Sequence, residues 1–158
     1  SMLVLIIGSM IGFVLFNLGT FGKKRGVFLG DSGSNLIGFW VAWCAVYASQ
    51  NQLYDIEPIT MLWFVAIPFL DCIGLIFSRI KRGISWSSPG RDHIHHKLMN
   101  RYSPEKTLVI ILLVSLIAGL IGIFLNNAFS PWVSTYLFIV YAAGYYLYAY
   151  YYANIKIK

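Results

Sequence analysis

The chain has 158 residues, of which 58% are hydrophobic and only 11% are charged. A soluble domain carries about a quarter charged residues, so this composition excludes an ordinary soluble globule and indicates an integral membrane protein. The net charge of +6 would suit nucleic-acid binding, but basic residues also gather on the cytoplasmic loops of membrane proteins.

Five apolar segments approach the ~20 residues that a helix needs to cross a bilayer. The first carries Gly8 and Gly12 in a spacing that suits close packing of helices. The third contains Pro68 and Asp71, and the fifth is crowded with tyrosines, which suit an interface or a contact between helices. We therefore predict an all-α integral membrane protein with about five transmembrane helices, over residues 3–18, 35–49, 59–78, 107–125 and 132–153.

The 12 basic residues all lie on one side of these segments. They follow the first, third and fifth segments, whereas the opposite loops hold only Asp55 and Glu57 among charged residues. By the positive-inside rule, we expect the N-terminus outside, the C-terminus in the cytoplasm, and cytoplasmic loops over residues 19–34 and 80–105. Topology then explains the positive charge, and no nucleic-acid partner is expected. The chain opens on an apolar run without a basic flank, so no cleavable signal peptide is expected.

The first loop enters the second segment through the sequence Gly30-Asp31-Ser32-Gly33-Ser34. Asp31 has two interpretations. As a helix cap, it would satisfy free backbone N–H groups. As a metal ligand, it would bind Mg²⁺ while neighbouring N–H groups receive phosphate. The residues alone leave both interpretations open.

The second loop holds all three histidines of the chain, His93, His95 and His96, close to Arg91. Zinc binding is one interpretation, but no cysteine or other clear set of partners accompanies them. A basic, histidine-rich loop suits a polyanionic ligand such as a nucleotide diphosphate, because arginine makes bidentate contacts and histidine donates or shuttles a proton near neutral pH. We therefore expect a functional site in this loop.

Asp92 is expected to cap a short helix that follows a proline–glycine turn in the same loop. Ile94, Leu98 and Tyr102 would then form an apolar stripe along this helix and rest on the membrane surface. Two of the histidines would share one flank of it.

Asp71 lies inside the third segment, one turn after Pro68. An ionisable side chain within a membrane span is costly, so it is a functional hypothesis by default. The alternative is a buried hydrogen bond between helices near the proline, where a carbonyl freed from the helix needs a partner. The residues do not decide between these roles.

Three motifs occur in order along the chain. They are Phe28-Leu29-Gly30-Asp31-Ser32-Gly33-Ser34, Ile67-Pro68-Phe69-Leu70-Asp71 and Arg91-Asp92-His93-Ile94-His95-His96. In this order the chain resembles the second half of the bacterial polyprenyl-phosphate N-acetylhexosamine-1-phosphate transferases. The His-Ile-His-His sequence is more similar to the members that transfer N-acetylglucosamine (GlcNAc) 1-phosphate from UDP-GlcNAc to undecaprenyl phosphate than to the peptidoglycan branch.

The resemblance implies a membrane-embedded, Mg²⁺-dependent active site that opens to the cytoplasm, with Mn²⁺ as an alternative metal. In this family the aspartate at the position of Asp31 is a metal ligand, and the histidine motif lies at the nucleotide-sugar site. We therefore expect Asp31 to be a metal ligand and a catalytic residue. Catalytic roles are also expected for His93, His95 and His96, and substrate binding for Arg91, Asp71, Ser32 and Ser34.

The resemblance also implies the partners and the location. We expect the partners to be UDP-GlcNAc, undecaprenyl phosphate and the lipid bilayer, and a homodimer is left open. The location would be the bacterial inner (plasma) membrane. The product would initiate a cell-envelope polysaccharide such as the O-antigen of lipopolysaccharide or a wall teichoic acid.

The chain departs from the family at its upstream end. Members carry an Asp-Asp motif and an Asn/Asp-rich motif before the part matched here, whereas the first acidic residue of this chain is Asp31. We therefore interpret residues 1–158 as the C-terminal part of a single polytopic transferase domain, and expect it to be inactive alone. The alternatives are a truncated, non-catalytic paralogue or structural subunit, an enzyme like the phospho-N-acetylmuramoyl-pentapeptide transferases, and a transporter coupled through Asp71.

Overall fold

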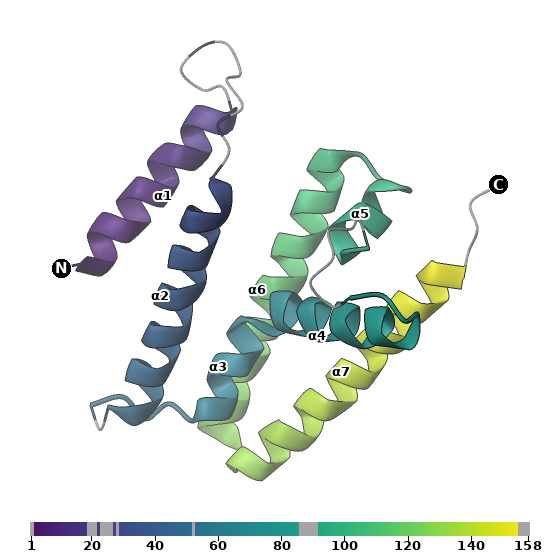
Figure 1. Cartoon of the computed structure of the whole chain (residues 1–158). Coiled ribbons are helices and arrows are strands. Elements are labelled where there is room, and N and C mark those ends of the chain that lie inside the picture. The colour runs from purple at the N-terminus through teal and green to yellow at the C-terminus, as the bar shows by residue number, and fades with distance from the viewer. Residues whose placement is uncertain are drawn as a thin grey trace. The chain divides into compact units, whose positions relative to one another are not determined.

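The computed structural model describes residues 2–18, 22, 27, 29–51, 53–85 and 92–154. Within these residues all regular structure is helical (Figure 1), which agrees with the predicted all-α class. The helices are α1 (Met2–Leu18), α2 (Gly30–Gln50), α3 (Pro58–Phe64), α4 (Ala66–Lys81), α5 (Ile94–Met99), α6 (Pro104–Ala128) and α7 (Pro131–Asn154). The chain divides into two compact units, residues 1–43 and residues 44–158.

Each of the five predicted membrane segments coincides with a helix or with a pair of helices. Within the described residues, α6 is long and apolar enough to cross a membrane, and α3 with α4 would be a second candidate if the pair is counted as one span. α1 contains a shorter apolar stretch, Val4–Asn17. The number of five spans and the sidedness of the loops therefore stay predictions.

The surface of α6 supports a membrane environment. Leu112, Leu116, Leu120 and Phe124 follow one another at four-residue intervals, and each is more than half exposed. Soluble monomers seldom expose a contiguous apolar surface of this kind. Lipid chains would cover it in a bilayer.

The third predicted segment, residues 59–78, is not one helix. α3 and α4 meet at Val65, and they are bent by 83° relative to each other. Pro68 accounts for the position of the break, because its ring crowds the carbonyl four residues earlier, that of Phe64, and it lacks an N–H group to bond that carbonyl. In the first turn of α4 the missing N–H is tolerated, since no N–H there has a partner within the helix. The single predicted span is therefore replaced by two short helices.

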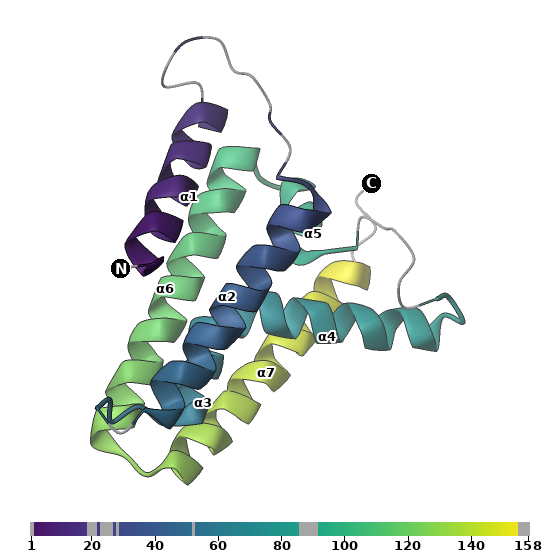
Figure 2. The same ribbon diagram turned by 60° about the vertical axis from the view of Figure 1, so that its left-hand side comes forward.

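Two glycines of α6 bring α3 close to it, and both views of the structure show these helices side by side (Figures 1 and 2). A Cβ added at Gly119 would meet the ring of Phe64 at 3.1 Å, and one added at Gly122 would meet the Cβ of Trp63 at 2.5 Å. At Gly8 and Gly12, where the sequence predicted close packing, no described heavy atom lies within 4 Å of an added Cβ. Close helix packing therefore occurs at these two glycines of α6, and the packing role of Gly8 and Gly12 stays a prediction.

The first hydrophobic core gathers around Trp63. Its buried members are Trp63, Ala66, Ala118, Leu125 and Phe138. The indole Nε1–H of Trp63 donates to the hydroxyl of Ser134 at 3.1 Å, and this serine is 1% exposed. Because a buried indole N–H needs a partner, the bond fixes α3 against α7.

Replacing Gly122 by alanine is expected to lower the free energy of unfolding by about 1–3 kcal/mol, because the new methyl group would overlap Trp63 in a packed core. The comparison is Gly38→Ala in α2, where an added Cβ meets no described heavy atom within 4 Å. Both changes bring the same gain in helix propensity. Thermal unfolding of the two variants in detergent measures the difference, and equal midpoints would contradict this account of α3 and α6.

The second core holds the short helix α5. Ile94 and Leu98 are buried against Ile67 of α4, and Tyr102, Ile110, Ile111, Tyr141 and Tyr145 pack around them. The prediction that the stripe of α5 rests on the membrane surface is therefore wrong. A helix of 6 residues is too short to be stable without tertiary contacts, and α4, α6 and α7 provide them.

Candidate active site

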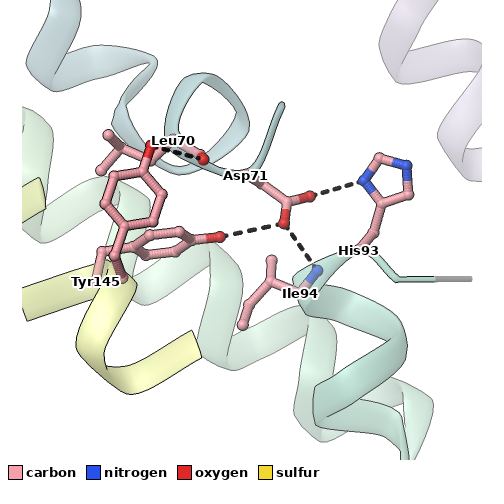
Figure 3. A network of polar contacts seen from close by, with 6 residues as sticks. Leu70, Asp71, His93, Ile94 and Tyr145 are labelled. Carbon is pink, nitrogen blue, oxygen red and sulfur yellow. Dashed lines mark hydrogen bonds and ion pairs between the residues drawn. The ribbon is translucent and has the colours of Figure 1, made fainter. Parts of the chain in front are cut away.

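Asp71 is the residue on which three helical elements converge. It lies on α4, and its side chain is 15% exposed. Oδ2 lies 2.8 Å from Nδ1 of His93, whereas Oδ1 accepts from the backbone N–H of Ile94 at 3.0 Å and from the hydroxyl of Tyr145 at 3.2 Å (Figure 3). The carboxylate therefore joins α4 to the start of α5 and to α7.

The N-terminus of α5 is capped from another helix. His93 occupies the N-cap position without a side-chain cap bond, and Asp71 binds the N–H of Ile94, the first residue of α5. The prediction that Asp92 caps this helix is wrong, because Asp92 pairs with Arg82 at 2.8 Å. Hydrogen bonding to that guanidinium lowers the pKa of Asp92. The two side chains are 45% and 43% exposed, and a pair open to solvent contributes about 0–1 kcal/mol.

The three histidines form a continuous cluster. The rings of His93 and His95 are stacked with centroids 5.6 Å apart, and those of His95 and His96 are 4.1 Å apart. Burial lowers the pKa of His95 below its ordinary value of 6.5, and the neighbouring His96 and His93 lower it further. The folded chain therefore binds a proton at His95 less readily than the unfolded chain, and this residue's contribution to stability falls as the pH drops below 6.5.

The contact with Asp71 orients the imidazole of His93. An ionised carboxylate can only accept hydrogen bonds, so the proton of neutral His93 resides on Nδ1. The second ring nitrogen, Nε2, lies on the side away from Asp71 (Figure 3), and the side chain is 42% exposed. A carboxylate that fixes the tautomer in this way leaves Nε2 available as a proton acceptor.

Asp31, Ser32 and Ser34 lie in the first unit, at the start of α2. Asp31 is the second residue of the helix, which lies inside its first turn and beyond the cap position. Gly30 precedes it with φ +69°, a conformation that favours glycine. The hydroxyl of Ser34 bonds the carbonyl oxygens of Gly30 at 3.2 Å and Asp31 at 3.0 Å, so its proton is engaged within the helix. The side chain of Asp31 is exposed, and its role as a metal ligand stays a prediction.

The metal prediction is not tested by the described residues. Among the described residues, no group of three histidine, cysteine, aspartate or glutamate side chains is placed to hold a metal ion, which also leaves the zinc interpretation without support. Mg²⁺, however, is commonly bound through one or two carboxylates together with substrate phosphates and water. Asp31 can supply one such carboxylate. Arg91, predicted to bind substrate, lies outside the described residues.

Sequence reasoning missed Tyr145 as part of this cluster. Its segment was interpreted as an interface or a contact between helices, without a partner for any tyrosine. A tyrosine hydroxyl inside an apolar span needs a hydrogen-bond acceptor, and Asp71 was the acidic residue within a predicted span. Together these two facts could have indicated a contact between a tyrosine of the fifth segment and Asp71.

Comparisons with curated proteins show relatives over most of the chain. An undecaprenyl-phosphate alpha-N-acetylglucosaminyl 1-phosphate transferase of Yersinia pestis is 38% identical over 138 residues, which are 85% of this chain and 38% of the relative. The protein of the same name from Escherichia coli (strain K12) is 35% identical over 148 residues, 92% of this chain and 40% of the relative. That of Haemophilus influenzae is 36% identical over 120 residues, 75% of this chain and 34% of the relative.

Two further comparisons found nothing. No protein-family model matches the chain, and no solved structure matches it. The chain spans about 40% of the length of the Escherichia coli relative. Over most of its own length it is nevertheless homologous to proteins named as undecaprenyl-phosphate alpha-N-acetylglucosaminyl 1-phosphate transferases, which confirms the resemblance predicted from its motifs.

Proposed function

We propose that the complete gene product containing this chain transfers GlcNAc 1-phosphate from UDP-GlcNAc to undecaprenyl phosphate and releases UMP. The observation that carries the proposal is the similarity to transferases of this name over 92% of the chain. The contact between Asp71 and His93 supports the proposal, because it orients a histidine of the predicted nucleotide-sugar motif. The activity is proposed for the complete gene product, since the chain spans about 40% of the relative.

The reaction joins two phosphates. An oxygen of undecaprenyl phosphate forms a bond to the β-phosphorus of UDP-GlcNAc, and the bond from that phosphorus to the oxygen bridging the two phosphates breaks. The bridging oxygen and its electron pair leave with UMP. Phosphoryl transfer of this kind depends mainly on positioning and on stabilisation of charge, so it suits a site built from carboxylate and imidazole groups.

His93 provides the group that acts on the phosphates. With Nδ1–H held by Asp71, its Nε2 takes a proton from the acceptor phosphate when neutral, or donates a hydrogen bond to a diphosphate oxygen when protonated. His95 and His96 extend the same surface toward the diphosphate, and His95 stays neutral over a wider pH range because its pKa is lowered.

Asp31 would supply a carboxylate to the metal, and the N–H groups at the start of α2, beside Ser32, would suit a phosphate group. Mg²⁺, or Mn²⁺ in its place, would neutralise the charge of the diphosphate oxygens when bound. The basic residues of the loops would concentrate anionic substrates at the membrane surface. These roles require both loops to face the cytoplasm, on the inner membrane of a bacterium.

The test is transfer of radiolabelled GlcNAc from UDP-GlcNAc to undecaprenyl phosphate, in membranes from a host that lacks its own enzyme. The complete gene product is expected to form the lipid-linked product, and chelation of divalent metal is expected to abolish it. Residues 1–158 alone are expected to form none, because the chain carries few carboxylates to hold Mg²⁺ and manage the acceptor phosphate. Transfer from UDP-N-acetylmuramoyl-pentapeptide instead would contradict the proposal, and so would the absence of lipid-linked product.

A further inference from the structure

The contacts of Asp71 extend beyond the sequence motifs to the last helix. Tyr145 lies on α7, 74 residues after Asp71, and its hydroxyl donates to Oδ1 at 3.2 Å. α7 contributes nothing to the three motifs that indicated function. We infer that Tyr145 is a positioning residue, which holds the carboxylate of Asp71 in the orientation that keeps Oδ2 on Nδ1 of His93.

The two oxygens of Asp71 have different donors. Oδ1 accepts hydrogen bonds from the N–H of Ile94 and the hydroxyl of Tyr145, whereas Oδ2 lies against Nδ1 of His93. The terminal torsion of an aspartate is broad, so the plane of the carboxylate depends on its donors. Ile94 and His93 are neighbours in one segment and would move together. Tyr145 comes from a different helix and opposes such a joint movement.

Packing holds the ring of Tyr145 in place independently of its hydroxyl. The ring lines an apolar cavity of about 360 Å³ together with Ile67, Ile94, Leu98 and Ile111, and it packs against the second core. A phenylalanine at this position would keep these contacts. Tyr145→Phe therefore removes the hydrogen bond to Asp71 while preserving the packing of α7.

Tyr146 offers a matched control. Its hydroxyl donates to the backbone carbonyl of Leu70 at 3.3 Å, so it also joins α7 to α4, one residue before Asp71. If these hydroxyls served only to dock α7 on α4, Tyr145→Phe and Tyr146→Phe would behave alike. A positioning role predicts that only the first variant affects His93.

The first measurement is the tautomer of His93. The complete gene product is labelled with ¹⁵N-histidine in nanodiscs, and the signals of His93 are identified by their loss in His93→Gln. We expect the Nδ1–H tautomer in the wild type and in Tyr146→Phe. In Tyr145→Phe, the ratio of the Nδ1–H to the Nε2–H form is expected to fall by about two- to tenfold, the effect of one hydrogen bond.

The second measurement is transfer of GlcNAc 1-phosphate, and this part rests on the proposed function. Tyr145→Phe is expected to lower kcat by about two- to tenfold with an unchanged KM for UDP-GlcNAc, since no group that binds the nucleotide sugar is removed. An unchanged tautomer ratio in Tyr145→Phe, or equal shifts in the two tyrosine variants, would overturn the inference. If the wild type transfers no GlcNAc 1-phosphate, the proposed function fails, and the tautomer ratio still decides the role of Tyr145.

Discussion

Replacing Asp71 by asparagine is expected to lower kcat for transfer of GlcNAc 1-phosphate by about 10²- to 10⁴-fold, the range that a positioned acid–base group supplies. Asparagine has nearly the same shape as aspartate, but one of its two terminal groups is a donor. The amide therefore cannot accept hydrogen bonds from His93, Ile94 and Tyr145 as the carboxylate does. An amide N–H facing Nδ1 would favour the opposite tautomer of His93, with its proton on Nε2.

The control for this variant is Asp92→Asn. Asp92 immediately precedes His93 and carries the same functional group, but it forms an exposed pair with Arg82. Its replacement is expected to change kcat by no more than about threefold, since exposed pairs are worth little. Membrane insertion and thermal unfolding are compared for both variants. Near-normal transfer by Asp71→Asn would show that Asp71 only connects helices, the alternative that the sequence left open.

Replacing Asp31 by asparagine is expected to lower transfer by about 10²-fold or more, because a hard cation requires the charge of the carboxylate. Asparagine keeps much of the capping ability of aspartate. The substitution therefore separates the two interpretations of Asp31 more sharply than alanine would. The measurement is the rate of transfer in the complete gene product over a range of Mg²⁺ concentrations, where part of the loss should be recovered at high Mg²⁺.

Asp55→Asn is the matched control for Asp31→Asn. Asp55 lies before α3, and the structure uses its backbone carbonyl, which accepts from the side-chain amide of Asn126 at 2.7 Å. Asparagine at position 55 keeps that carbonyl, so normal transfer is expected. If Asp31→Asn retained wild-type transfer at every Mg²⁺ concentration, Asp31 would not be a metal ligand.

Local chemistry made several features predictable from the sequence. Helices occur at all five apolar segments, because apolar runs of this length form helices wherever backbone groups must be satisfied internally. The clustering of His93, His95 and His96 was also predictable, since residues so close along the chain cannot lie far apart. A disturbance near Pro68 was predictable as well, because it follows from the ring and the missing N–H of that residue.

The details that depend on distant contacts were not predictable. Asp92 was expected to cap α5 because it follows a proline–glycine turn, but the N–H of Ile94 is bound by Asp71 from 23 residues away. The stripe of α5 was expected to face lipid, but it packs on Ile67. In both cases the partner of the α5 residue comes from α4, a distant element of the chain, and not from the local sequence.

By itself, the sequence determined the apolar helical segments, the motifs and the similarity to the transferases, because each depends on residue types and on short spacing. Only the tertiary structure decided that Asp71 is shared by His93 and Tyr145, which lie 22 and 74 positions away from it. The sharp bend at Val65 turns α4 across α7 (Figure 2). Ile94 and Leu98 of α5 are buried against Ile67 of α4. Long-range packing of this kind depends on which helix surfaces fit together, so a local sequence pattern does not predict it.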